Sequence, residues 1–144
     1  MNVGKIKTPE ALFSEKALTP ENKDQIRKSI LESADLLKDI EFDGPVVDTL
    51  RQAMEHVDGS GPLGLKADEI ILTARIIAVA NAFVAMVSTR AYREAMSIDT
   101  ALDELHKLVD KTYSRKVVAA LEHYIENAGG RESWGQIATA AKAS

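Results

Sequence analysis

Cysteine is absent from the sequence, and aromatic residues make up only 5% of it. Without cysteine the chain can form no disulfide, no thiolate metal site and no thiol nucleophile, which fits a cytoplasmic protein. With so few aromatics, the core must be built from aliphatic side chains. A basic excess is absent too, since the formal net charge is −4. We therefore expect no general nucleic-acid binding, because that requires a basic face.

A signal peptide and a membrane span are also lacking. The N-terminal stretch MNVGKIKTPE contains no apolar run. The most apolar stretch, IILTARIIAVANAFVAMV at residues 70–87, is interrupted by Arg75 and Asn81 and has no basic flank to set an orientation. We therefore expect no contact with a membrane and predict that residues 70–93 form a central buried helix.

Glycine and proline are scarce, with eight and four residues in the chain of 144. Because they gather between stretches rich in Ala and Leu, the pattern favours an all-α fold in a single domain. We predict five to seven helices: residues 20–39, 45–57, 70–93, a helix from 97, 114–128 and a short one from 133. The expected N-caps are Thr19, Ser97, Ser114 and Ser133, the last paired with Gln136 in a capping-box spacing.

Apolar residues recur at helical spacing within these ranges. Each set defines one inward-facing stripe, which predicts the core. The stripes are Ile26, Ile30, Ser33, Leu37 and Ile40; Val46, Val47, Leu50 and Met54; Ala101, Leu102, Leu105 and Leu108; and Val117, Val118, Leu121 and Ile125.

One loop, DGSGPLGLK at residues 58–66, holds three glycines and a proline. It is neither a P-loop nor a nucleophile elbow, because it lacks both consensus patterns. Its backbone N–H groups suit an anion, with Lys66 nearby. Just before it, Glu55, His56 and Asp58 bring one imidazole and two carboxylates together. Such a set predicts at most a weak metal site, the alternative being a solvated helix end.

A second basic cluster lies in STRAYREA, residues 88–95. Arg90 and Arg93 are three residues apart and share a helical face, which suits a phosphate group. The alternative is a helix C-terminus that attracts cations. We take Lys66, Arg90 and Arg93 as candidate ligand-binding residues and assign no catalytic residue, metal ligand or cofactor.

The run from DGSGPLGLKADEI through LTARIIAVANAFVAMVSTRAYREAMS resembles the second half of the HD-GYP domain. That family comprises bacterial cyclic di-GMP phosphodiesterases of the HD phosphohydrolase superfamily. MNVGKIKTPEALFSEKALTPE and KTYSRKVVAALE resemble further family segments, so the resemblance covers about residues 1–125 and leaves 126–144 as a C-terminal helical extension. It implies a helical bundle of the HD-GYP type. The remnant of the family's loop motif is Glu55, His56, Asp58, Gly59, Gly61 and Pro62.

The chain departs from the family pattern at the implied metal ligands. The family's HD pair corresponds to Met1 and Asn2, and two histidines correspond to Ala53 and Met54. Other changed positions are Ser29, Asn81, Val84, Thr89 and Ala91. The family's metals generate hydroxide and hold the phosphate, and these side chains cannot replace imidazole and carboxylate ligands. The resemblance thus implies a metal-free, inactive domain in which Ala53, Met54 and Val84 fill the former polar cavity.

Three functions stay open. The first is a regulatory module that contacts a protein partner through inherited surfaces, including the 58–66 loop. The resemblance implies that this loop region contacts diguanylate cyclase domains. The second is a receptor that holds cyclic di-GMP or another phosphate ligand through the three basic candidates. The third is a metal-dependent phosphohydrolase with an altered site around Glu55, His56 and Asp58.

The position of Met1 also sets an expectation, because it corresponds to the family's HD pair. The helices that precede this pair in the family are then missing, so the chain is expected to be a fragment or a shortened protein. An upstream receiver or sensor domain becomes another expected partner. An exposed apolar patch, and a homodimer formed through it, are expected where the missing helices would pack.

Overall fold

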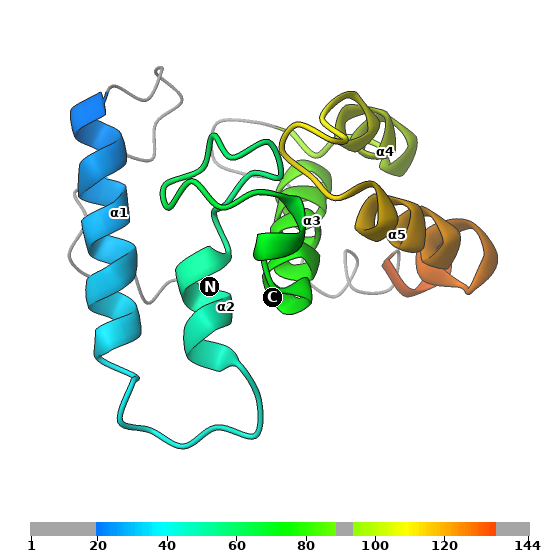
Figure 1. Ribbon diagram of the computed structural model, residues 1–144. Helices are drawn as coiled ribbons and strands as arrows, with labels where there is room; N and C mark the ends of the chain where they lie inside the picture. Colours follow the sequence, from blue (N-terminus) through cyan, green and yellow to red (C-terminus); the bar gives the residue numbers. More distant parts are fainter. Residues whose placement is uncertain (1–19, 89–93, 135–144) are drawn as a thin grey trace. The chain divides into compact units, whose positions relative to one another are not determined.

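The computed structural model describes residues 20–88 and 94–134, and these are helical wherever they are regular (Figure 1). Within those two ranges no β-strand occurs, and only two isolated β-bridges form. Residues 130–134 continue as a further helical stretch. The elements are α1 (Pro20–Asp35), α2 (Val46–Gln52), the 3₁₀ helix η3 (Ala67–Glu69), α3 (Leu72–Val87), α4 (Ile98–Lys107) and α5 (Arg115–Asn127). The predicted all-α fold is confirmed.

The chain divides into two compact units, Met1–Ala74 and Arg75–Ser144, and helix α3 begins in the first and continues in the second. The single domain over residues 1–144 stays a prediction. None of the helices that the structure describes is both long and apolar enough to cross a bilayer.

In the first unit, α1 and α2 pack against each other (Figure 1). Polar side chains join α2 to the start of α3. The hydroxyl of buried Thr49 lies 2.6 Å from that of Thr73, and the side-chain oxygen of Gln52 accepts a hydrogen bond from the Ile71 N–H at 2.8 Å. These bonds fix both ends of the segment that contains the 58–66 loop.

In the second unit, helices α3, α4 and α5 share one apolar core. The only aromatic ring among its buried members is Phe83, which makes a T-shaped contact with Trp134, the ring centroids lying 5.8 Å apart. The buried members are Val79, Phe83, Val87, Ala101, Leu102, Leu105, Val117, Val118 and Ile125. The predicted aliphatic core is confirmed in this unit.

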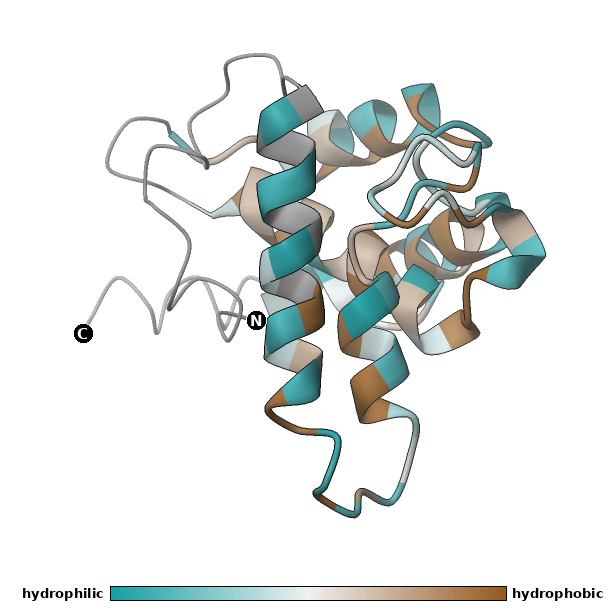
Figure 2. Ribbon diagram, turned by 60° about the vertical axis from the view of Figure 1, so that its left-hand side comes forward, coloured by the Kyte–Doolittle hydropathy of each residue, from teal (hydrophilic) through white to brown (hydrophobic). Residues whose placement is uncertain are grey.

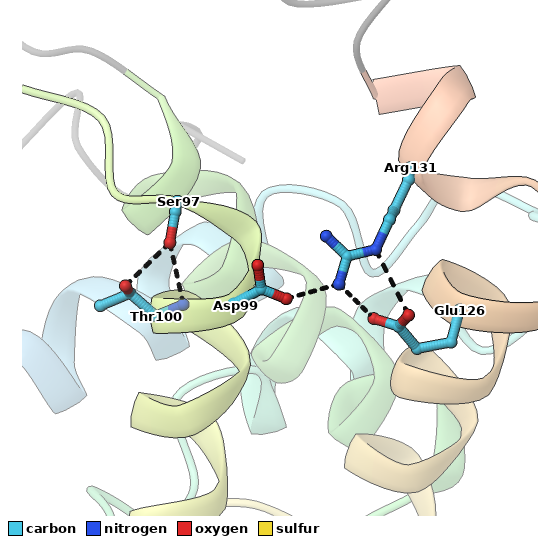
Figure 3. A network of polar contacts seen from close by, with 5 residues as sticks. All are labelled: Ser97, Asp99, Thr100, Glu126 and Arg131. Atoms are coloured by element: carbon cyan, nitrogen blue, oxygen red, sulfur yellow. Dashed lines mark hydrogen bonds and ion pairs between the residues drawn. The ribbon is translucent and has the colours of Figure 1, made fainter.

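Polar contacts tie residues 130–134 to the first turn of α4 (Figure 3). The hydroxyl of Ser97 accepts from the Thr100 N–H at 3.1 Å, which confirms the predicted N-cap. Arg131 donates to Glu126 and to Asp99. Its hydrogen bond and positive charge lower the pKa of Asp99 below the ordinary value. The two carboxylates raise the pKa of Arg131 in turn.

Helix ends differ from the prediction in the first unit. Helix α1 ends at Asp35 rather than near residue 39, because the chain turns through hydrogen bonds that span three residues, such as Ile40 N–H to Leu37 C=O at 3.1 Å. Helix α2 ends at Gln52, well before residue 57. Ile40 and Met54, predicted to face inward, lie beyond these ends and are exposed; Val46, at the start of α2, was also predicted inward and is exposed.

Three details of the second unit also differ. Leu108, predicted inward, lies just past the end of α4 and is exposed. Ser114 is the N-cap residue of α5, but its hydroxyl makes no capping hydrogen bond. Ser133 lies inside the helical stretch that starts at residue 130, so the predicted capping box is wrong. Thr19 and residues 89–93 of the predicted 70–93 helix lie outside the described residues.

Candidate functional site

Glu55 lies at the centre of the candidate site, just beyond the end of α2. It is buried, with 4% of its surface exposed. Its Oε1 accepts a hydrogen bond from the Leu63 N–H at 2.6 Å, and its Oε2 accepts one from the Leu65 N–H at 2.9 Å. Bonds from backbone N–H groups to a buried carboxylate are charge-assisted and short. The loop therefore does hold an anion, and that anion is the carboxylate of Glu55.

Most of the other N–H groups of the loop also have internal partners. Those of residues 59, 64 and 67 donate to backbone carbonyls of residues 56, 61 and 57. Those of Ser60 and Lys66 donate to side-chain oxygens of Asp58 and Glu69, both at 2.9 Å. With the two bonds to Glu55, seven of the eight N–H groups in residues 59–67 donate within the segment. Six of these seven belong to the 58–66 loop, and for those six the expectation that they bind an outside anion is wrong.

Two glycines of the loop are required by its geometry. A Cβ on Gly61 would lie 2.7 Å from the Glu55 Cα and 2.8 Å from the His56 nitrogen, so no side chain fits there without moving the backbone. Gly59 has a φ of +84°, which L-residues rarely adopt, and the aliphatic part of Lys66 covers it. These glycines allow the chain to fold tightly around Glu55.

His56 and Asp58 do not converge with Glu55 on a common point. The His56 Nδ1 lies 2.8 Å from the Ser60 hydroxyl, and the Asp58 carboxylate accepts from the Ser60 N–H. Both oxygens of Glu55 face the loop amides instead. Among residues 20–88 and 94–134, no group of three or more His, Asp or Glu side chains is placed to hold a metal ion.

The positions to which the family resemblance assigns metal ligands do not fit a metal centre where the structure describes them. Ser29, Ala53, Met54, Asn81 and Val84 offer no imidazole or carboxylate. Met54 and Val84 are 46% and 44% exposed, so the prediction that they fill a cavity is wrong. The two positions that correspond to the family's HD pair, residues 1 and 2, lie outside the described part of the chain. The changed family positions 89 and 91 also lie outside it.

Of the three basic candidates, the structure places only Lys66. Its backbone forms an antiparallel bridge with Asp58, and its side chain is exposed beside Gly59. Arg90 and Arg93 lie outside the described residues. A phosphate site made from all three basic residues stays a prediction.

Comparison with known proteins identifies the family of the chain. A family model described as the HD domain matches residues 1–117. The chain belongs to the HD domain family. Similar proteins include a cyclic di-GMP phosphodiesterase of Thermotoga maritima, 46% identical over 67 residues, and the cyclic di-GMP phosphodiesterase response regulator RpfG of Xanthomonas campestris pv. campestris, 44% identical over 68. Each match covers 46% of this chain and 18% of the relative.

A longer match joins this HD domain chain to the cyclic di-GMP phosphodiesterase PdeB of Borreliella burgdorferi, 27% identical over 127 residues. It covers 87% of this chain and 34% of that protein. The chain therefore spans from about a fifth to a third of the length of these curated relatives. The predicted resemblance to the cyclic di-GMP phosphodiesterases of the HD superfamily is confirmed.

Proposed function

We propose that this HD domain chain is a catalytically inactive regulatory module that acts through contact with a protein partner. One observation carries the proposal: both oxygens of the buried Glu55 carboxylate accept backbone N–H groups of the 58–66 loop. The loop thus keeps its form through bonds to this side chain, and each oxygen of the carboxylate already accepts a backbone N–H group. A diguanylate cyclase domain or an upstream receiver or sensor domain is the partner that the family resemblance suggests.

The alternative is hydrolysis of a cyclic dinucleotide, the activity for which the relatives are named. In the HD superfamily this chemistry depends on metal-activated water and on metals that bind the phosphate. The changed residues at the described ligand positions, Ser29, Ala53, Met54, Asn81 and Val84, favour the inactive module over this alternative.

Metal analysis and a hydrolysis assay test the proposal together. The purified chain is loaded with manganese or iron, desalted and analysed for metal content, and its hydrolysis of cyclic di-GMP is followed by chromatography. The phosphodiesterase of Thermotoga maritima, treated in parallel, is the positive control. We expect far less than one metal per chain and no hydrolysis above buffer. One bound metal together with hydrolysis that EDTA abolishes would overturn the proposal.

Lys66 supports a second candidate function, the sensing of a phosphate ligand such as cyclic di-GMP. Its ammonium is exposed at the edge of the loop, on a backbone that the bridge to Asp58 holds in place. Calorimetric titration with cyclic di-GMP, at low salt with EDTA present, tests this. Binding that is lost in a variant with Lys66→Ala, Arg90→Ala and Arg93→Ala would support it, whereas absence of binding heat favours the protein-contact function.

A further inference from the structure

The loop between α1 and α2 exposes large apolar side chains to solvent. Leu36, Ile40, Phe42 and Val46 are 65%, 51%, 39% and 37% exposed. Single exposed apolar residues are common, but four within eleven residues concentrate exposed apolar side chains in one segment, and concentrated apolar surface marks interaction sites. Figure 2 shows hydrophobic segments alternating with hydrophilic ones along this loop and at the adjoining helix ends. We refer to these residues as the 36–46 surface.

Backbone hydrogen bonds hold the two ends of this loop. The Leu36 and Leu37 N–H groups donate to carbonyls of α1 at 3.1 Å. Ile40 donates to the Leu37 carbonyl at 3.1 Å, and Val46 donates to the Gly44 carbonyl at 2.8 Å. Because these bonds hold both ends of the loop, a partner would lose less affinity to ordering it than it would with an unstructured segment.

The negative charge of the chain is concentrated around the same surface. Residues 35–48 contain five carboxylates and one lysine, so their net charge is −5 + 1 = −4, which equals the formal net charge of the whole chain. All five carboxylate residues are exposed, and only the first forms an ion pair within the described structure, with Arg51 at 3.3 Å. They are Asp35, Asp39, Glu41, Asp43 and Asp48.

This charge selects among the possible occupants. A second copy would bring its own net charge of −4 against this one, and nucleic acid or an anionic membrane would also be repelled. A helix with an apolar face and flanking Lys or Arg residues satisfies both the apolar and the acidic requirement. No strand edge is available in this part of the described structure for an extended peptide to join.

We propose that the 36–46 surface docks a basic amphipathic helix of a protein partner. The apolar face of the helix covers Leu36, Ile40, Phe42 and Val46, while its cations face the surrounding carboxylates. This inference rests on the proposed regulatory function and adds to it the surface used and the chemistry of the partner.

Fluorescence anisotropy with a defined probe tests the docking surface. The probe is a labelled 18-residue helical peptide of leucine and lysine, and a leucine–glutamate peptide of the same pattern is its control. One variant of the full chain carries Asp39→Asn, Glu41→Gln and Asp43→Asn, and another carries Ile40→Ser and Phe42→Ser. A matched variant neutralises three exposed carboxylates elsewhere: Glu94→Gln, Asp103→Asn and Glu132→Gln.

We expect the wild-type chain to bind the basic peptide, and the Kd to rise at least tenfold in both loop variants but less than twofold in the matched variant. Binding should weaken as salt is added, because exposed charges are screened. No binding by the wild type, or an equal loss in the matched variant, would overturn the proposal. So would sedimentation of a wild-type dimer that Ile40→Ser with Phe42→Ser converts to a monomer, since the surface would then bind a second copy.

The two proposals can fail separately. Metal content and cyclic di-GMP hydrolysis do not depend on the 36–46 surface, so they are measured on the same loop variants. Hydrolysis by the wild type, with peptide binding still lost in the loop variants, would reject the inactive module and leave the docking surface in place. Absence of hydrolysis together with unchanged peptide binding in the loop variants would reject the docking surface and leave the inactive module in place.

Discussion

Replacement of Glu55 by Gln tests the central contact of the loop directly. The amide has nearly the shape of the carboxylate, but only one of its two terminal atoms can accept a hydrogen bond. Its NH₂ group must then face either the Leu63 or the Leu65 N–H, and because both groups are donors, no hydrogen bond forms between them. A hydrogen bond to a charged group contributes about 1.5–3 kcal/mol, and a buried donor left unpaired costs about 1–3 kcal/mol. We expect Glu55→Gln to destabilise the loop by about 2–3 kcal/mol.

Amide hydrogen exchange measured by NMR is the appropriate assay, because the chain has two compact units and one global unfolding midpoint would combine them. A loss of about 2–3 kcal/mol corresponds to exchange roughly 30- to 150-fold faster at Leu63 and Leu65. The control is Glu69→Gln, which alters an exposed carboxylate that accepts only the Lys66 N–H. Unchanged exchange at Leu63 and Leu65 in the Glu55 variant would refute the proposed role of this carboxylate.

Three further predictions concern local contacts. Gly61→Ala should destabilise the first unit by about 1–3 kcal/mol because its Cβ would meet backbone atoms at 2.7 Å, whereas Gly44→Ala, with nothing within 4 Å, should be nearly neutral, as measured by amide hydrogen exchange in that unit. Ser97→Ala should cost about 1 kcal/mol through loss of the α4 cap, and unchanged amide hydrogen exchange in α4 would contradict this. The depressed pKa of Asp99 means that its ion pair stabilises the fold above pH 3.8 and is lost as the pH falls through the folded pKa. In Arg131→Gln an NMR titration should find that pKa back near 3.8, and an unmoved value would show that the guanidinium is not the cause.

The sequence predicted the helical class and much of the second unit for clear physical reasons. Amphipathic spacing alone places Leu105 in the core, and Val118 likewise. Ser97 was identified as an N-cap because a hydroxyl just before a periodic apolar segment can accept a free N–H group of the first turn. Such signals depend only on neighbouring residues, so they can be recognised in the sequence without knowledge of the tertiary structure.

The ends of α1 and α2 could not be predicted in the same way. Periodicity shows which face of a helix is apolar but not where competing hydrogen bonds end it. Helix α2 ends where Gln52 accepts the Ile71 N–H, a partner 19 residues away in the sequence. Helix α1 ends at Asp35, which leaves Ile40 in a turn and exposed instead of buried. The same departure creates the 36–46 surface.

The candidate site was predicted as a segment but not as a set of contacts. Its glycines marked the 58–66 loop, and the family pattern marked Glu55 as a remnant. The role of Glu55 depends on donors eight and ten residues later, Leu63 and Leu65, which no periodic pattern reveals. A glutamate shortly before a glycine-rich loop, with no Lys or Arg adjacent to it, is the signal that would have indicated a carboxylate bound by backbone N–H groups.

The polar groups of residues 55–69 bond mainly to one another: Glu55 to the loop amides, His56 to Ser60 and Lys66 to Glu69. The Val57 carbonyl accepts the N–H of residue 67, which brings the two ends of the segment together. When the polar groups of a segment bond to one another in this way, its conformation depends little on the rest of the protein. It is therefore suited to grafting between two helices of an unrelated protein, as a short rigid connector of defined shape.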